Sequence, residues 1–288
     1  MKRYRIPELA EKAMKHDMIS SNMEMPDFPD ARIRLLFVYL DKNPTIKRNS
    51  ELYALASSLV QMGLDTHDLI DTDDEKKSER EMRTRQVNVL AGDFFSSRFY
   101  QLLAQAGEVN MVRQLSDAVC EVNRQKMNLY MRVKQLLLST DEYLSLLVQL
   151  KMYLLTAFQS VMDEVNQKTW PDMLRAFTQC EIVREEMNKN NELRSFKGSW
   201  AYWHILQEGT EEDQLLLRDN KVEVRHIQSL WTKYNIHNLL LDKLRQTIAD
   251  IQNMLREPVS EKIHRDLMSI AEPFLRITHE PLTVVKEG

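Results

Sequence analysis

The apolar residues of the chain recur every three or four positions, which is the spacing of one face of an α-helix. The clearest run extends over about seven turns from Val112 to Leu137, and only Lys126 interrupts it. No proline falls between Pro44 and Pro171, and only six glycines occur in the chain, which also favours long helices. The pattern therefore predicts an all-α protein. Similar runs predict helices over 33–40, 52–70, 87–103, 143–165, 173–187, 223–241 and 244–255.

Polar and proline-containing stretches separate the predicted helices and mark the expected loops. They lie at 25–29, at 42–44, after Asp71 and at 208–213. No repeat of fixed period and no low-complexity linker interrupts this order. We therefore expect a single domain over 1–288, with a mobile loop region at 188–209.

Composition and charge narrow the class of protein. The 288 residues are 43% hydrophobic and carry a formal net charge of −4, so the chain can build a core but has no basic excess for nucleic acid. Cys120 and Cys180 are isolated, and no signal-peptide core follows Met1, which favours the cytoplasm. The longest apolar region, 144–161, contains Lys151 and two glutamines and falls short of the ~20 apolar residues of a membrane span.

Acidic residues gather where the predicted helix over 52–70 ends. The stretch from Leu64 to Lys77 reads LDTHDLIDTDDEKK, and VLAGD opens the next predicted helix at Val89. In an unrelated helical protein such a run is most often a solvated loop. Together, however, these segments resemble the trans-prenyl diphosphate synthases. The combination of LVQMGLDTHDLI with RQVNVLAGDFFS is most similar to the small subunits of two-component heptaprenyl diphosphate synthases, over about residues 30–158.

The resemblance implies an isoprenoid-synthase-like helical bundle and identifies the positions of the first aspartate motif. His67 and Asp71 stand at its first and fifth positions, and Asp68 is its retained second aspartate. In catalytic members these positions hold magnesium that bridges an allylic diphosphate. An imidazole in place of a carboxylate weakens such a site, because magnesium prefers oxygen ligands. Lys76 and Lys77 replace an arginine pair and lose its planar donor geometry.

The other diphosphate-binding positions are altered as well. The second aspartate motif falls on 184–188 and begins with Arg184, whose fixed charge opposes metal binding. Of the motif that binds isopentenyl diphosphate, Arg32 and Arg34 remain but the lysine is lost, and Lys151 matches the lysine of a later pair. The resemblance thus implies a vestigial site with no catalytic residue and no metal bound tightly by this chain. Magnesium is expected in a catalytic partner subunit.

A catalytic prenyl diphosphate synthase subunit, component II, is therefore the expected partner. In homodimeric relatives the helices that correspond to 87–103 and 112–137 form the subunit contact. Aromatic residues and methionines are enriched at such contacts. The candidate interface residues are Phe94, Phe95, Phe99, Tyr100, Met127 and Tyr130. The pair would add isopentenyl diphosphate units to farnesyl diphosphate and supply the side chain of menaquinone.

Two functions of other classes remain compatible with the residues. An autonomous magnesium-dependent prenyltransferase could use Asp68, Asp71, Asp73 and Asp74, and activity of the isolated chain would favour it. A helical interaction or lipid-binding protein could keep the fold without prenyl chemistry. Failure to bind any prenyltransferase would favour that alternative.

Overall fold

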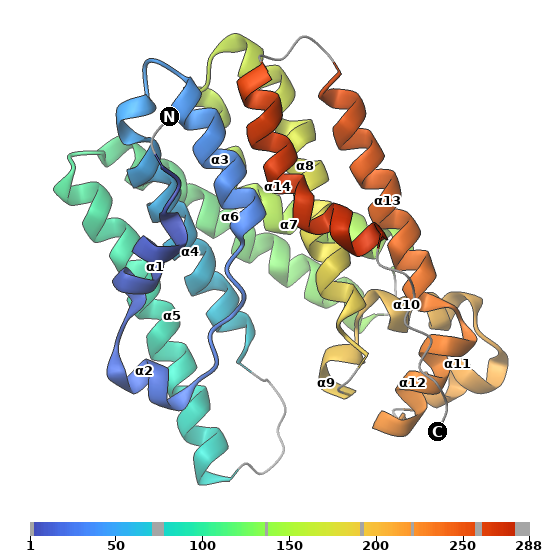
Figure 1. Ribbon diagram of the computed structural model, residues 1–288. Helices are drawn as coiled ribbons and strands as arrows, with labels where there is room; N and C mark the ends of the chain where they lie inside the picture. The colour runs from blue at the N-terminus through green and yellow to red at the C-terminus, as the bar shows by residue number, and fades with distance from the viewer. Residues whose placement is uncertain are drawn as a thin grey trace. The chain divides into compact units, whose positions relative to one another are not determined.

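The computed structural model describes residues 3–70, 78–135, 138–190, 193–219, 222–256 and 261–279. Every regular element among these residues is helical (Figure 1), so the predicted fold class is confirmed. Where one domain was expected, the chain groups into two compact units. Unit 1 comprises Met1–Val122 with Tyr153–Trp170, and unit 2 comprises Asn123–Met152 with Pro171–Gly288. The unit boundaries fall inside the helices α6 (Val109–Lys134), α7 (Thr140–Thr156) and α8 (Glu164–Met187).

Unit 1 is built around α4 (Ser50–Asp68), most of whose residues are buried. Three helices pack on it: α1 (Ile6–Met14), α3 (Asp30–Lys42) and α5 (Glu79–Gln105). The short α2 (Asp17–Asn22) lies against α5. The 3-10 helices η1 (Lys47–Asn49) and η2 (Gln159–Val161) complete the described elements of this unit.

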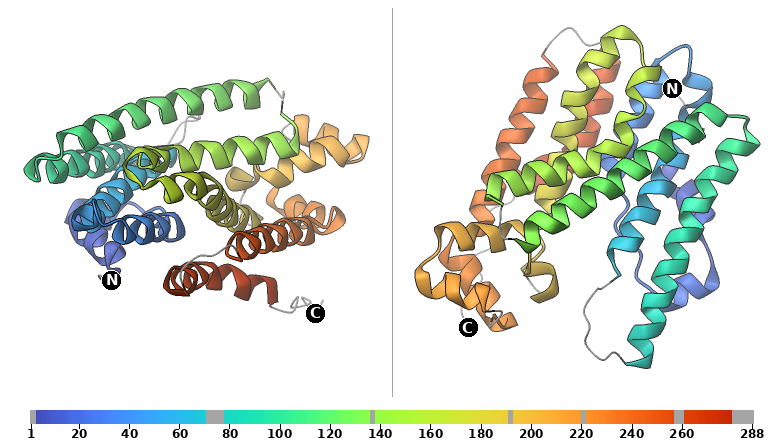
Figure 2. Two further views of the ribbon diagram at one scale, coloured as in Figure 1. Left: turned by 90° about the horizontal axis from the view of Figure 1, so that it is seen from above. Right: turned by 180° about the vertical axis from the view of Figure 1, so that it is seen from behind.

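The most extensive contact in unit 1 joins α4 to α5, which lie side by side in both Figures 1 and 2. A capping box starts α5: the Ser78 hydroxyl accepts from the Glu81 backbone N–H while the Glu81 carboxylate accepts from the Ser78 N–H, which satisfies N-terminal donors. The buried face of α5 has the predicted helical spacing. It consists of Asn88, Ala91, Gly92, Phe95, Phe99 and Leu103.

A polar network ties the start of α4 to the connection between α5 and α6. The Tyr53 hydroxyl donates to Glu108 Oε2 at 2.6 Å, and the Asn49 side-chain amide donates to the other oxygen of that carboxylate. Burial, together with the Glu108 carboxylate, raises the pKa of Tyr53 to about 12. The neutral phenol is therefore the form that the fold stabilises.

Unit 2 contains the remaining helices, of which α13 and α14 lie side by side (Figure 1). The predicted helix over 223–241 is interrupted at Asn235, whose φ of 51° is left-handed and ends a right-handed helix. Likewise, the run over 143–165 is broken between α7 and α8 by a turn and η2. The bounds are α9 (Leu193–Phe196), α10 (Trp200–Glu208), α11 (Glu211–Arg218), α12 (Val224–Lys233), α13 (Ile236–Met254) and α14 (Glu261–His279).

Within 188–209, where a mobile loop region was expected, the described residues include the helices α9 and α10. The Ser199 hydroxyl caps α10 by accepting from the Tyr202 N–H, and Trp200 and Trp203 are both buried. Buried Glu186 of α8 accepts from the Trp200 N–H at 2.8 Å and from Lys189 Nζ at 2.7 Å. It also bonds Tyr143, whose pKa is raised well above its usual value, chiefly by burial.

One segment in the described part of the chain, Thr140–Val161, is long and apolar enough to cross a membrane by composition. Its most apolar window is 39% buried. Leu154, Leu155 and Phe158 are almost completely covered. A core helix of a globular protein meets the same criteria of length and composition, so the segment is weak evidence for a span.

We predict that Tyr53→Phe lowers the free energy of unfolding by about 1 to 2 kcal/mol near neutral pH, because a hydrogen bond to a carboxylate is lost. The folded-state pKa of Tyr53 lies above its usual value. The deficit relative to the unsubstituted protein is therefore full below about pH 10 and shrinks as the pH rises toward 12. Urea denaturation of both proteins between pH 7 and pH 11 measures it. A deficit that grows with pH would contradict this assignment.

Glu186→Ala is expected to lower the free energy of unfolding by about 3 kcal/mol, because it leaves the Lys189 ammonium and the Trp200 N–H without their acceptor. Glu186→Gln keeps one acceptor oxygen and should cost about 1 to 2 kcal/mol. Chemical denaturation followed by circular dichroism compares the two variants. Equal midpoints for Glu186→Ala and the unsubstituted chain would show that the hydrogen bonds of Glu186 contribute nothing.

Candidate functional site

The first candidate position, His67, lies in the last turn of α4 and is directed at α5. Its Nε2 is 3.4 Å from Asp93 Oδ1. The imidazole also covers Gly92, because a Cβ placed on that glycine would be 2.6 Å from two atoms of the ring. The His67 side chain is 35% exposed. The residue at the first motif position therefore packs between two helices.

The rest of the first motif is described only in part. Asp68 is the last residue of α4 and is exposed. Asp71, Lys76 and Lys77 lie outside the described residues. The structure consequently places His67 and Asp68 in neighbouring positions at one helix end, and their relation to the acidic run stays a prediction.

The two retained arginines, Arg32 and Arg34, lie in the first turns of α3. Arg32 is only 3% exposed. The Arg34 guanidinium lies 5.6 Å from the centre of the Tyr4 ring, and the Tyr4 hydroxyl donates to Asp30 at 2.7 Å. A cation over an aromatic face is held by the ring quadrupole, so the start of α3 is fastened to the segment before α1.

The remaining two positions belong to unit 2. Lys151 is half-buried on α7. Arg184, at the first position of the second motif, lies on α8 with its guanidinium 5.4 Å from the centre of the Phe274 ring of α14. Phe274 is almost completely buried. Arg184 therefore joins two helices, a contact that the sequence pattern of α14 did not reveal.

The donor set in the described part of the chain does not fit a magnesium site. No group of three or more His, Cys, Asp or Glu side chains that could hold a metal is found there. At the two motif starts, an imidazole and a guanidinium replace the oxygen ligands that magnesium prefers.

Of the candidate interface residues, Phe95 and Phe99 are buried, at 0% and 8% exposed, and belong to the core of unit 1. Their burial within this chain runs against their assignment to the partner interface. Phe94 is half-buried, with the His16 ring 6.0 Å away. Tyr100, in contrast, is 58% exposed.

On α6, Met127 and Tyr130 are 63% and 52% exposed. Met131, one turn after Met127 on the same helix, is 49% exposed. On α5, Leu90 is 67% exposed and was not among the predicted residues. We call Leu90, Phe94 and Tyr100 the α5 face, and Met127, Tyr130 and Met131 the α6 face.

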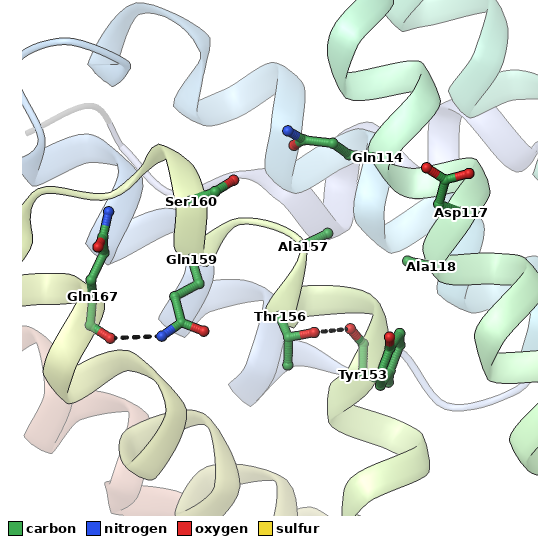
Figure 3. A pocket seen from close by; sticks show the side chains of 9 residues that line it. All are labelled: Gln114, Asp117, Ala118, Tyr153, Thr156, Ala157, Gln159, Ser160 and Gln167. Atoms are coloured by element: carbon green, nitrogen blue, oxygen red, sulfur yellow. Dashed lines mark hydrogen bonds between the residues drawn. The ribbon is translucent and has the colours of Figure 1, made fainter.

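Unit 1 also has an open hollow of about 520 Å³ lined mainly by polar side chains (Figure 3). Two of its polar side chains are bonded to backbone carbonyls: Gln159 donates to Gln167, and Thr156 donates to Tyr153. None of the predicted site residues lines it. Among the residues that line this hollow, Asp117 alone is charged. Its carboxylate would repel a diphosphate, so the lining does not favour binding of one.

Solved structures of related fold include a decaprenyl diphosphate synthase from Rhodobacter capsulatus, which is 15% identical with a TM-score of 0.67 over 96% of this chain and 95% of that chain. A polyprenyl synthase from Caulobacter crescentus, solved with calcium and isoprenyl diphosphate, is 13% identical with a TM-score of 0.69 over 96% and 94%. At such low identity these likenesses establish the fold, which is that of the isoprenyl diphosphate synthases.

Sequence comparison is more specific. Heptaprenyl diphosphate synthase component 1 of Geobacillus stearothermophilus is 42% identical over 91 residues, which are 32% of this chain and 39% of that relative's length. Residues 16–236 match the family described as heptaprenyl diphosphate synthase (HEPPP synthase) subunit 1. This match confirms the resemblance found in the acidic run and VLAGD, and the chain belongs to the heptaprenyl diphosphate synthase subunit 1 family.

Proposed function

We propose that this chain is the small, non-catalytic subunit of a heterodimeric heptaprenyl diphosphate synthase in the cytoplasm. With a catalytic partner, component II, it would extend farnesyl diphosphate by isopentenyl diphosphate units for the menaquinone side chain. Membership of the subunit 1 family supports this proposal. The partner would supply the magnesium that assists ionisation of the allylic diphosphate.

One observation carries the non-catalytic assignment: the first residue of each vestigial motif is engaged in a helix–helix contact. His67 lies on Gly92 and beside Asp93, and Arg184 lies over Phe274. A magnesium clamp needs carboxylate oxygens directed at a common point. Side chains of another chemistry, turned onto neighbouring helices, do not form one.

The α5 face and the α6 face support the partner assignment. Each carries exposed aromatic or methionine side chains, and such residues are enriched where proteins bury a contact surface. Tyrosine in particular adds a large apolar area at small entropic cost. We propose that both faces contact the catalytic subunit.

Co-expression with a candidate catalytic subunit tests the function as a whole. We expect the two chains to purify together and to produce a heptaprenyl diphosphate that neither chain makes alone. Product formation by this chain alone would favour an autonomous prenyltransferase. If this chain forms no complex with any prenyltransferase tested, the result would favour a helical interaction or lipid-binding protein.

For metal binding, we predict that the isolated chain forms no tight complex with magnesium and farnesyl diphosphate, and that His67→Asp alone creates no synthase activity. The imidazole and guanidinium positions lack the required oxygens, and restoring one carboxylate leaves the second motif unchanged. Calorimetric titration of both proteins checks this, with a catalytic synthase as the positive control. Submicromolar binding by the unsubstituted chain would refute the prediction.

For the partner surface, the double substitution Met127→Ala and Tyr130→Ala should weaken association by about tenfold or more, as truncation of interface anchors does. Because both side chains are more than half exposed, the melting temperature of the isolated chain should stay nearly unchanged. Sedimentation or calorimetry measures the dissociation constant.

The matched control for that variant is Leu215→Ala, which removes a 57% exposed side chain from α11 of the same unit. It should leave association unaltered. If both variants bind the partner equally well, the α6 face is not the contact surface.

A further inference from the structure

Two glycines at the contact between α4 and α5 allow unusually close approach of the helices. Gly63 of α4 faces Ser96 of α5, and one turn further along, Gly92 of α5 faces His67 of α4. At either glycine, an added Cβ would come closer to its neighbour than real side chains tolerate. Packing of α4 against α5 therefore requires a residue without a side chain at both positions.

These two levels define the register of the helix pair. Gly63 faces Ser96 and His67 faces Gly92, so a step of four residues forward along α4 matches a step of four residues back along α5, as in an antiparallel helix pair. The same register places Val60 opposite Phe99 on the following level, and both are buried. His67 thus forms the last level of a continuous packed seam, one residue before α4 ends at Asp68.

The His67 ring is held on two sides at this level. Its face covers Gly92, and its Nε2 is 3.4 Å from the Asp93 carboxylate. All three neighbours that a Cβ on Gly92 would meet first are atoms of this one imidazole. The imidazole is therefore the spacer between α4 and α5 at the end of α4.

We propose that His67 is a positioning residue for assembly, whose imidazole against Gly92 sets the distance between α4 and α5 and so places the α5 face for the catalytic partner. This rests on the proposed function. Leu90 and Phe94 are each two residues from Gly92, so they point to the opposite side of the same turn. Anything that pushes α5 away from His67 moves them by a similar distance.

The competing interpretation is that His67 is merely a surface residue whose ring swings aside without consequence. The two interpretations differ in how the side chains at 67 and 92 depend on each other. If the imidazole is a spacer, a methyl group added at Gly92 weakens association only while the imidazole is present. If the ring moves freely, the added methyl group has no effect on association even when the imidazole is present.

The test compares Gly92→Ala, His67→Ala and the double variant in the full-length chain. Partner dissociation constants are measured at a temperature at which circular dichroism shows each variant fully folded. Gly92→Ala should weaken association by about tenfold, because strain from overpacking is relieved by moving α5. The double variant should return to within about twofold of His67→Ala.

Gly63→Ala is the matched control, because its Cβ would also meet backbone: the Gly92 carbonyl oxygen at 3.0 Å and the Ser96 nitrogen at 3.2 Å. Truncation of Ser96 to alanine should therefore fail to rescue it. This contrast separates a side-chain spacer from general intolerance of the seam to substitution.

Unaltered association of Gly92→Ala, or a double variant as defective as Gly92→Ala, would overturn the proposal. If the folded variants lose thermal stability but bind the partner as tightly as the unsubstituted chain, His67 has a structural role only. If the unsubstituted chain binds no catalytic subunit, the proposed function fails instead, and rescue of the melting temperature still decides whether His67 is the spacer.

Discussion

The close approach of α4 and α5 is the constraint on which unit 1 depends. Other helices cover α4 on several sides. Gly63 and Gly92 let α5 approach α4 closely, because a side chain at either position would collide with Ser96 or with His67. Protein interiors are packed as densely as organic crystals. A small change of side-chain volume at the contact between α4 and α5 therefore shifts the helices, because no free space is left to accommodate it. The outer residues of α5 are consequently placed by what lies on its inner side.

The residues at the predicted motif positions take part in packing between helices. In this chain His67 and Arg184 stand at the motif starts and are used in contacts with α5 and α14. Within the predicted second motif, Glu186 accepts from the Trp200 N–H at the start of α10 and from the Lys189 ammonium. These side chains thus connect neighbouring segments of the fold.

Helical periodicity was sufficient to predict the fold class and the longest helices, because apolar stripes report directly on burial. It failed where tertiary contacts decide the structure. The left-handed Asn235 divides a run that looks continuous in sequence, and α10 forms in an expected loop because Trp200 and Trp203 find a buried environment. Burial of Phe95 and Phe99, as opposed to Tyr100, depends on the position of α4, which no pattern within α5 alone specifies. The partners of His67 and Arg184 were unpredictable for the same reason.

The central claim is that this chain contributes the scaffold and its partner the catalysis. It is tested most directly by measuring incorporation of labelled isopentenyl diphosphate with farnesyl diphosphate and magnesium while this chain is titrated into a fixed amount of the catalytic subunit. The account predicts no incorporation by this chain alone, and heptaprenyl product that rises to a plateau at equal amounts of the two chains. Turnover by this chain without the partner, or a product yield that is independent of its addition, would contradict the account.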